Sequence, residues 1–412
     1  MMIRHLVVCL LTVAGPVYAL QAPTVTGLLP TELARPLLEQ DPRVAAARAG
    51  LAVARQESNI LELSPYEWTA KAFGQRRSLD TGTQYREWNV GVERAIRLPG
   101  KRTADLTMGK ATIEESEARF GEAMHESAKD LLSLWIDWLA SERGRELAAA
   151  NLQAVQDNVM AVDQRSRAGD ASRLDLNLAN AELAEQKRQN NDAQTQAAAA
   201  WARISGRFPG IQPLRIALPS PLLMAEDVSP WRQRIMAESD VLKLAQTQLR
   251  MAQAQAEHAS ASRYADPTLG VYSTSEVGGR ERLMGVSISI PLLGGLRDSR
   301  SAKAAAAVEV ARQTVELTQR ELETEIATAF VTARGLYESL QMAKEGARAM
   351  QDNAKLVQRA YALGEGDLQS LLLARRQATA AENSALQAQV SALKAYYGLL
   401  TDAHFIWDLE HD

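Results

Sequence analysis

The side chains that could bind a metal ion or take part in catalysis are few and widely separated. His125, His258, His404 and His411 are scattered, and no two of them have the spacing of a metal-binding motif. The single cysteine, Cys9, lies in an N-terminal leader, so the mature chain has no thiol for a zinc site, a nucleophile or a disulfide. We therefore predict no metal site and no cofactor.

Signatures of the common enzyme classes are also missing from the sequence. It contains no Gly-x-x-x-x-Gly-Lys-Ser/Thr phosphate loop, no Gly-x-Ser-x-Gly nucleophile turn and no His-Glu-x-x-His zinc motif. Carboxylates are plentiful, but on long polar helices a solvated surface explains them. We predict that the protein is not an enzyme.

Acidic residues nevertheless accompany two glycine-containing turns. The residues of interest there are Gly169, Asp170, Asp175, Tyr361, Gly364, Glu365 and Asp367. Glycine can end a helix in the left-handed conformation without steric cost, which we expect of Gly169 and Gly364. A carboxylate beside a helix start can cap free N–H groups, whereas a group of exposed carboxylates can attract cations. Both interpretations stay open for Glu365 and Asp367.

The overall charge and composition exclude other classes of protein. The 412 residues include 46 basic and 50 acidic side chains, which gives a net charge of −4. Nucleic acid is an unsuitable partner, because phosphate binding needs a surplus of clustered cations. Hydrophobic residues make up 46%, enough for a core, so general disorder is excluded.

The N-terminus has the pattern of an export signal. Arg4 and His5 precede the apolar run Leu6 to Ala14, and Val17-Tyr18-Ala19 offers a cleavage site after small residues. We predict a signal peptide at 1–19 and an exported, unlipidated protein. A buried N-terminal helix is the alternative.

Proline placement indicates the helices that position the two turns. No proline lies between residues 100 and 208 or between 292 and 412, and proline costs about 3 kcal/mol inside a helix. The spacing predicts long helices at 101–167 and 297–363, each about 100 Å long. Helices at 171–206 and 368–403 would follow the two turns.

The chain also contains an internal repeat. Leu-Pro-Gly-Lys-Arg at 98–102 and Leu-Gly-Gly-Leu-Arg at 293–297 are offset by 195 residues, and the same offset superposes Gly169 on Gly364. Such a constant spacing indicates duplication. We predict a first repeat at 20–206, a linker at 207–230 and a second repeat at 231–412. Each repeat would begin with a shorter helix, at 32–63 and 231–264.

A strand hairpin is predicted between the first and the long helix of each repeat. The hairpins span 65–98 and 267–292, and within them residues 84–92 and 283–290 alternate between apolar and polar side chains. Strands of about nine residues with one apolar face fit a transmembrane β-barrel. A half-buried sheet of a soluble protein shows the same alternation.

The doubled order of helix, hairpin, long helix, glycine turn and helix resembles the outer-membrane efflux protein family, the TolC-like channels. The motifs that carry the resemblance are Asp41-Pro42-Arg43-Val44, the strand exits Gly100 to Arg102 and Gly295 to Arg297, Ser289-Ile290-Pro291-Leu292, and the two turns. It covers about residues 30–405. Each motif is weak alone, but together, in this order and with the strand exits and the turns doubled, they make a strong resemblance.

The resemblance implies a mainly α protein with a small β part. Duplicated long-helix hairpins would form a periplasmic α-barrel, and four strands per subunit would contribute to a 12-stranded transmembrane β-barrel in a homotrimer. The channel would lie in outer-membrane lipid and extend into the periplasm, with the linker at its equator. Its partners would be a periplasmic adaptor protein and an inner-membrane efflux pump.

Details of the resemblance bear on cargo and gating. The Leu-Pro-Gly-Lys-Arg exit is similar to the heavy-metal cation efflux branch (CzcC-like), which implies heavy-metal cations as substrate. Tyr361 matches a linking tyrosine of a closed channel mouth, but Gly366 stands where some members carry a linking arginine, and Ser370 replaces the acid found at Asp175. With three subunits, Glu365 and Asp367 would still place six carboxylates at the mouth.

Two other classes of protein remain as alternatives. A periplasmic coiled-coil adaptor would have one helical hairpin flanked by β-rich domains, whereas this chain has two hairpins and four strands. A structural coiled-coil envelope protein would need neither alternating strands nor glycine turns.

Overall fold

Two very long helices dominate the computed structural model, as the absence of internal proline predicts. The structure describes residues 26–214, 216–224, 226–292 and 294–407. α3 (Pro99–Ala168) has 70 residues and α7 (Gly295–Ala362) has 68. At 1.5 Å per residue, each is about 100 Å long. The predicted signal peptide and His411 lie outside the described residues.

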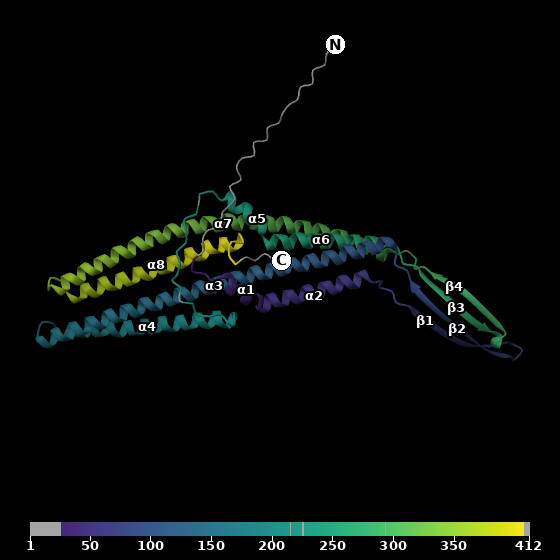
Figure 1. Ribbon diagram of the computed structural model, residues 1–412, viewed down its shortest axis with the longest axis horizontal. Coiled ribbons are helices and arrows are strands. Elements are labelled where there is room, and N and C mark those ends of the chain that lie inside the picture. The colour runs from purple at the N-terminus through teal and green to yellow at the C-terminus, as the bar shows by residue number, and fades with distance from the viewer. Residues whose placement is uncertain (1–25, 215, 225, 293, 408–412) are drawn as a thin grey trace, which may run out of the picture.

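Shorter helices placed end to end run beside each long helix. They are α1 (Thr31–Glu39), α2 (Pro42–Glu62), α4 (Arg173–Arg207), α5 (Ser229–Glu238), α6 (Asp240–Ala261) and α8 (Leu368–Asp402). Figure 1 shows α2 along one half of α3 and α4 along the other, while α6 and α8 lie along α7 in the same way. α3 also contacts α6 and α8, which joins the two repeats.

The helices predicted at 32–63 and 231–264 are each interrupted, which corrects the prediction of continuous helices. α1 ends at Glu39, and Asp41 caps α2 by accepting a hydrogen bond from the backbone of Arg43 (2.7 Å). α5 ends at Glu238, and Ser239 caps α6 through the backbone of Leu242 (3.2 Å). Each cap satisfies a free N–H group, so a new helix can start there.

The four strands form one antiparallel sheet that joins the repeats. Its order is β1 (Thr69–Ser78), β2 (Gln84–Ala95), β3 (Thr268–Glu276) and β4 (Glu281–Ser289). β2 pairs with β3, with Val92 opposite Val271, and β1 and β4 are the two edges. The predicted fold class, mainly helical with four antiparallel strands, is confirmed.

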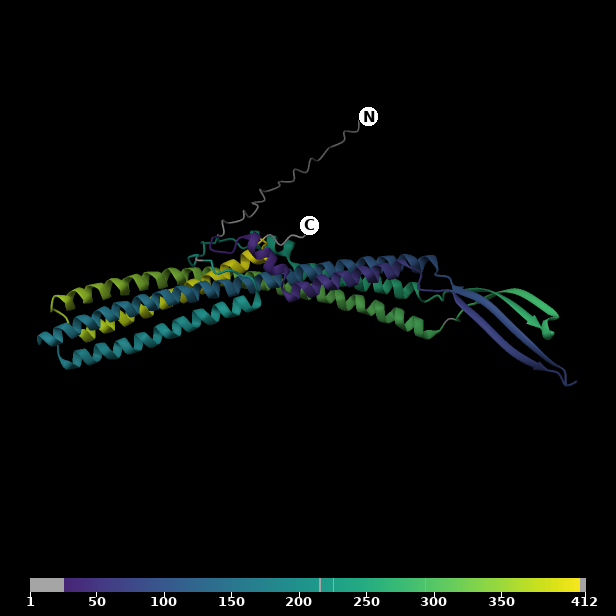
Figure 2. The same cartoon turned by 60° about the horizontal axis from the view of Figure 1, so that its bottom comes forward.

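The sheet projects beyond the ends of the helices (Figures 1 and 2). Met284, Val286 and Ile288 lie on one face of β4 and are 89%, 76% and 67% exposed. Within the described residues, no helix covers this apolar face. Such an exposed patch indicates a surface that meets another protein or a membrane.

The largest buried side chains lie at the waist, the middle of the molecule where the short helices meet. Trp135 is fully buried, and the ring of Trp138 packs at a tilt against those of both Trp135 and Trp201, at ring-centroid distances of 4.9 and 5.0 Å. Phe208 and Leu400 belong to the same cluster. The interpretation of Trp135 and Trp138 as core residues is therefore confirmed.

Asp266 holds together the strands and the start of α3. Its carboxylate lies 3.0 Å from Lys101 Nζ and 3.2 Å from Arg97 Nη1, and it accepts hydrogen bonds from the Tyr66 hydroxyl (2.6 Å) and the Leu98 backbone (3.1 Å). Burial opposes its ionisation, but these contacts outweigh burial and lower the pKa of Asp266. The Leu-Pro-Gly-Lys-Arg motif thus binds the first repeat to a residue of the second.

Asp266→Asn should destabilise the protein by about 3–5 kcal/mol, because Lys101 would stay buried without its counter-charge. The matched control is Asp352→Asn, which removes an exposed ion pair with Lys355 and should cost less than about 1 kcal/mol. Thermal unfolding followed by circular dichroism compares the two variants. Equal unfolding temperatures would show that the Asp266 cluster contributes no more than a surface ion pair.

Candidate functional site

The end of the molecule opposite the sheet is formed by two glycine turns, one from each repeat (Figures 1 and 2). Gly169 follows α3 with φ +86°, and Gly364 lies just beyond α7 with φ +80°, so both have the predicted left-handed conformation. In each turn the glycine N–H and the next N–H, of Asp170 or Glu365, donate to carbonyls of the last helical turn. These paired hydrogen bonds satisfy the free ends of the helices.

The helices after the turns begin with the same cap, but its two residues are exchanged. In α4, Ser172 is the N-cap and its hydroxyl donates to Asp175 Oδ2 at 2.8 Å. In α8, Asp367 is the N-cap and accepts from the hydroxyl of Ser370 at 2.8 Å. The same bonded pair of acid and serine is thus present in both repeats with its positions exchanged, which accounts for the acid at Asp175 and the serine at Ser370.

Asp367 combines capping with exposed charge. Its side chain accepts from the Ser370 backbone N–H at 2.8 Å, and this hydrogen bond, with that of the Ser370 hydroxyl, lowers the pKa of Asp367. The capping interpretation is confirmed for Asp367. The side chain of Glu365 is also exposed, while its backbone N–H completes the turn. Two carboxylates thus face solvent at the second turn.

Tyr361 connects the two turns. The guanidinium of Arg165, in the last turn of α3, lies 5.0 Å from the centroid of the Tyr361 ring. This cation–π contact lies next to a small apolar cluster that includes Val162 of α3 and Leu368 of α8. Tyr361 therefore links the repeats within one chain, a contact that the sequence did not indicate.

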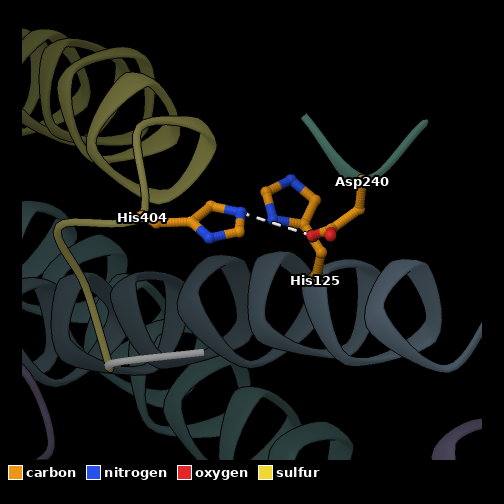
Figure 3. Close-up of side chains that lie close together, drawn as sticks. All are labelled: His125, Asp240 and His404. Atoms are coloured by element: carbon orange, nitrogen blue, oxygen red, sulfur yellow. Dashed lines mark ion pairs between the residues drawn. The ribbon is translucent and has the colours of Figure 1, made fainter. Parts of the chain in front are cut away.

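At the waist, the structure brings together two histidines that the sequence shows as scattered. His125, Asp240 and His404 each place a possible ligand atom within 4.8 Å of the others (Figure 3). The histidine rings are stacked with centroids 5.5 Å apart. Sequence spacing gave no sign of this cluster, because the three residues come from segments far apart in the chain.

Known structures share this fold. VceC from Vibrio cholerae is similar with a TM-score of 0.72 and 15% identity over 90% of this chain and 95% of that chain. CusC has a TM-score of 0.71 and 15% identity, over 89% of this chain and 92% of that chain. The open state of MtrE from Neisseria gonorrhoeae has a TM-score of 0.64 and 19% identity, over 90% of this chain and 88% of that chain. These likenesses show the fold, which is that of outer-membrane channel proteins.

The family follows from the sequence. The family model described as outer membrane efflux protein matches residues 33–206 and 231–401, so the chain belongs to that family. Among curated proteins, none matches the sequence. The chain is therefore an outer-membrane efflux channel subunit that extends into the periplasm, and it is not an enzyme. Among the described helices, none is long and apolar enough to cross a membrane.

Gly364→Ala should destabilise the second turn by about 1–2 kcal/mol, because alanine is unfavourable in the left-handed conformation. Gly346 is a matched control, since it lies inside α7 and a Cβ added there would point into open space. Gly346→Ala should instead stabilise the helix by about 0.5–1 kcal/mol. Hydrogen exchange of the α7 and α8 amides measures both effects, and unchanged exchange in Gly364→Ala would contradict the strain.

Proposed function

We propose that three copies of this chain form the outer-membrane channel of a tripartite efflux system. In this proposal a periplasmic adaptor protein and an inner-membrane pump meet the end that carries the glycine turns. The observation that carries it is a sheet with two open edges and an uncovered apolar face, about 100 Å of helix away from those turns.

The open edges favour a trimer. β1 and β4 each pair on one side, and unpaired backbone groups are not tolerated in hydrocarbon. Four strands are too few to close a sheet, for which about eight are needed. Three copies would supply twelve strands, with β1 of one copy beside β4 of the next. The exposed side chains of Val286 and Ile288 would then face lipid.

The linker at 207–230 would lie at the equator of the helical tunnel. It crosses α8 near its middle, where Gln389 Nε2 donates to the carbonyl of Pro219 at 2.6 Å. Its ends join the waist cluster through Phe208 and Met224. A proline-rich segment bound in this way connects the repeats without extending either helix.

Heavy-metal cations are the proposed cargo. Two features support this choice: the strand exit Leu-Pro-Gly-Lys-Arg, which is similar to that of the cation-exporting branch, and the exposed carboxylates of Glu365 and Asp367. Six such carboxylates around a trimeric mouth would raise the local concentration of cations. Neither a coiled-coil adaptor nor a structural envelope protein accounts for two strand hairpins that share one sheet.

The proposal is tested by extracting the full-length protein in detergent and separating its oligomers by size. We expect trimers, and we expect ion conductance in planar bilayers to follow the trimer fraction, because a monomer has open strand edges. Stable pores from a monomeric fraction would contradict the trimer. Trimers without conductance would contradict the channel.

Replacing Glu365 and Asp367 with Gln and Asn should lower the cation selectivity of the channel at low salt, with little loss of stability, because Asn retains the cap. The matched control is Asp170→Asn with Asp175→Asn, which removes two charges at the first turn. We expect the first-turn variant to keep its selectivity, since the second-repeat turn is proposed to lie inside the mouth. Unchanged reversal potentials in the second-turn variant would leave capping as the only role of these acids.

A further inference from the structure

The cluster of His125, Asp240 and His404 joins three elements at the waist (Figure 3). His125 lies in α3, Asp240 is the first residue of α6, and His404 follows the end of α8. The side chains of His125 and His404 are only 9% and 6% exposed, and that of Asp240 is 12% exposed. The cluster is therefore separated from bulk water.

His125 is arranged as metal-binding histidines commonly are. Its Nε2 lies 3.1 Å from Asp402 Oδ1, which Lys129 also contacts at 3.3 Å. A carboxylate only accepts hydrogen bonds, so this contact places the ring proton on Nε2 and leaves a lone pair on Nδ1. Nδ1 is buried and has no hydrogen-bond partner. Histidines that bind metals usually donate their other N–H to a carboxylate in this way.

His404 occupies a position where glycine would be less strained. It has φ +55° and ends α8 with the same paired backbone hydrogen bonds as the glycine turns. Its Nε2 lies 3.3 Å from Asp240 Oδ2, but without hydrogen-bond geometry. Two ligands of a tetrahedral zinc ion, each about 2.0–2.1 Å from the metal, lie about 3.3 Å apart. The separation of these two atoms already fits a shared metal ion.

The other break between short helices shows what the cluster lacks. There, Asp41 receives the Ser127 hydroxyl of α3 at 2.8 Å and the Arg207 guanidinium from the end of α4 at 2.6 Å. Asp240 likewise meets a residue of α3 and a residue beyond the end of α8, but both are histidines. Nearby, Glu122 Oε2 is also buried without a partner. A bound cation would give His125 Nδ1 and His404 Nε2 a partner, and it would offset the charge of Asp240 as Arg207 offsets that of Asp41 at the first break.

We infer that His125 Nδ1, His404 Nε2 and an Asp240 carboxylate oxygen bind a divalent transition-metal ion of the zinc class. Imidazole and carboxylate ligands suit this class, and three protein ligands leave one position for water. An adjoining cavity of about 50 Å³, lined in part by His125, Asp240 and Ile326, has room for that water. The ion would join α3, α6 and the end of α8, and it is independent of the proposed cargo.

The test uses the full-length protein, purified without a polyhistidine tag, treated with chelator and titrated with Zn²⁺ by calorimetry. We expect one Zn²⁺ per chain, with X-ray absorption showing nitrogen and oxygen ligands at about 2.0–2.1 Å. His404→Gly removes a ligand, and glycine adopts the left-handed conformation of this position readily, so the variant should keep its fold. We expect it to bind Zn²⁺ at least about 10-fold more weakly, and Asp402→Asn about 10–100-fold more weakly.

The matched control is His258→Asn. His258 is also a helical histidine paired with a carboxylate, 3.1 Å from Asp105, but it lies outside the cluster. The His258→Asn variant should therefore bind Zn²⁺ with the same affinity as the unmodified chain. Absence of stoichiometric binding, unchanged affinity in His404→Gly, or an equal loss in His258→Asn would each overturn the inference. Because equilibrium binding is measured, failure here would leave conductance, and thus the proposed function, unaffected.

Discussion

Packing at the waist is the interaction on which the rest of the structure depends. A helix of about 70 residues exposes most of its surface unless neighbours cover it, and tertiary packing supplies most helical stability in proteins. Between the waist and the turns the helices pack partly through small residues such as Ala354, Ala374 and Ala378, and a second, smaller apolar cluster lies at the turns themselves. The large side chains around Trp135 instead collect where the short helices end. The waist therefore fixes the columns, and both ends of the molecule extend from it.

Features set by local energetics could be predicted from the sequence. Proline and glycine have large local effects on the backbone, so their positions gave the long helices and the left-handed turns at Gly169 and Gly364. In the same way, the alternation of apolar and polar side chains predicted the strands. The break at Asp41 also had a local signal, an N-cap followed by Pro42, although the helix was predicted to be continuous. At Ser239 no proline follows, and the break there had a weaker signal.

Contacts between distant segments could not be predicted in this way. Periodicity indicates which face of a helix is buried, but it does not say which other helix covers that face. The contact of Arg165 with Tyr361, and the meeting of His125 with His404, depend on how the two repeats pack side by side. The role of Asp266 is a further example, since a residue before β3 in the second repeat secures the start of α3 in the first.

Duplication explains why such contacts differ between the repeats. Once two copies share a single chain, a bonded pair can be exchanged or replaced in one copy while the other keeps its original residues. The caps formed by Ser172 with Asp175 and by Asp367 with Ser370 retain the same bond with the partners reversed. At the helix breaks the change goes further, because Arg207 supplies a permanent positive charge beside Asp41, whereas Asp240 faces histidines. The first break is therefore held by a permanent charge of the chain, whereas at the second break the inferred metal ion would take that part.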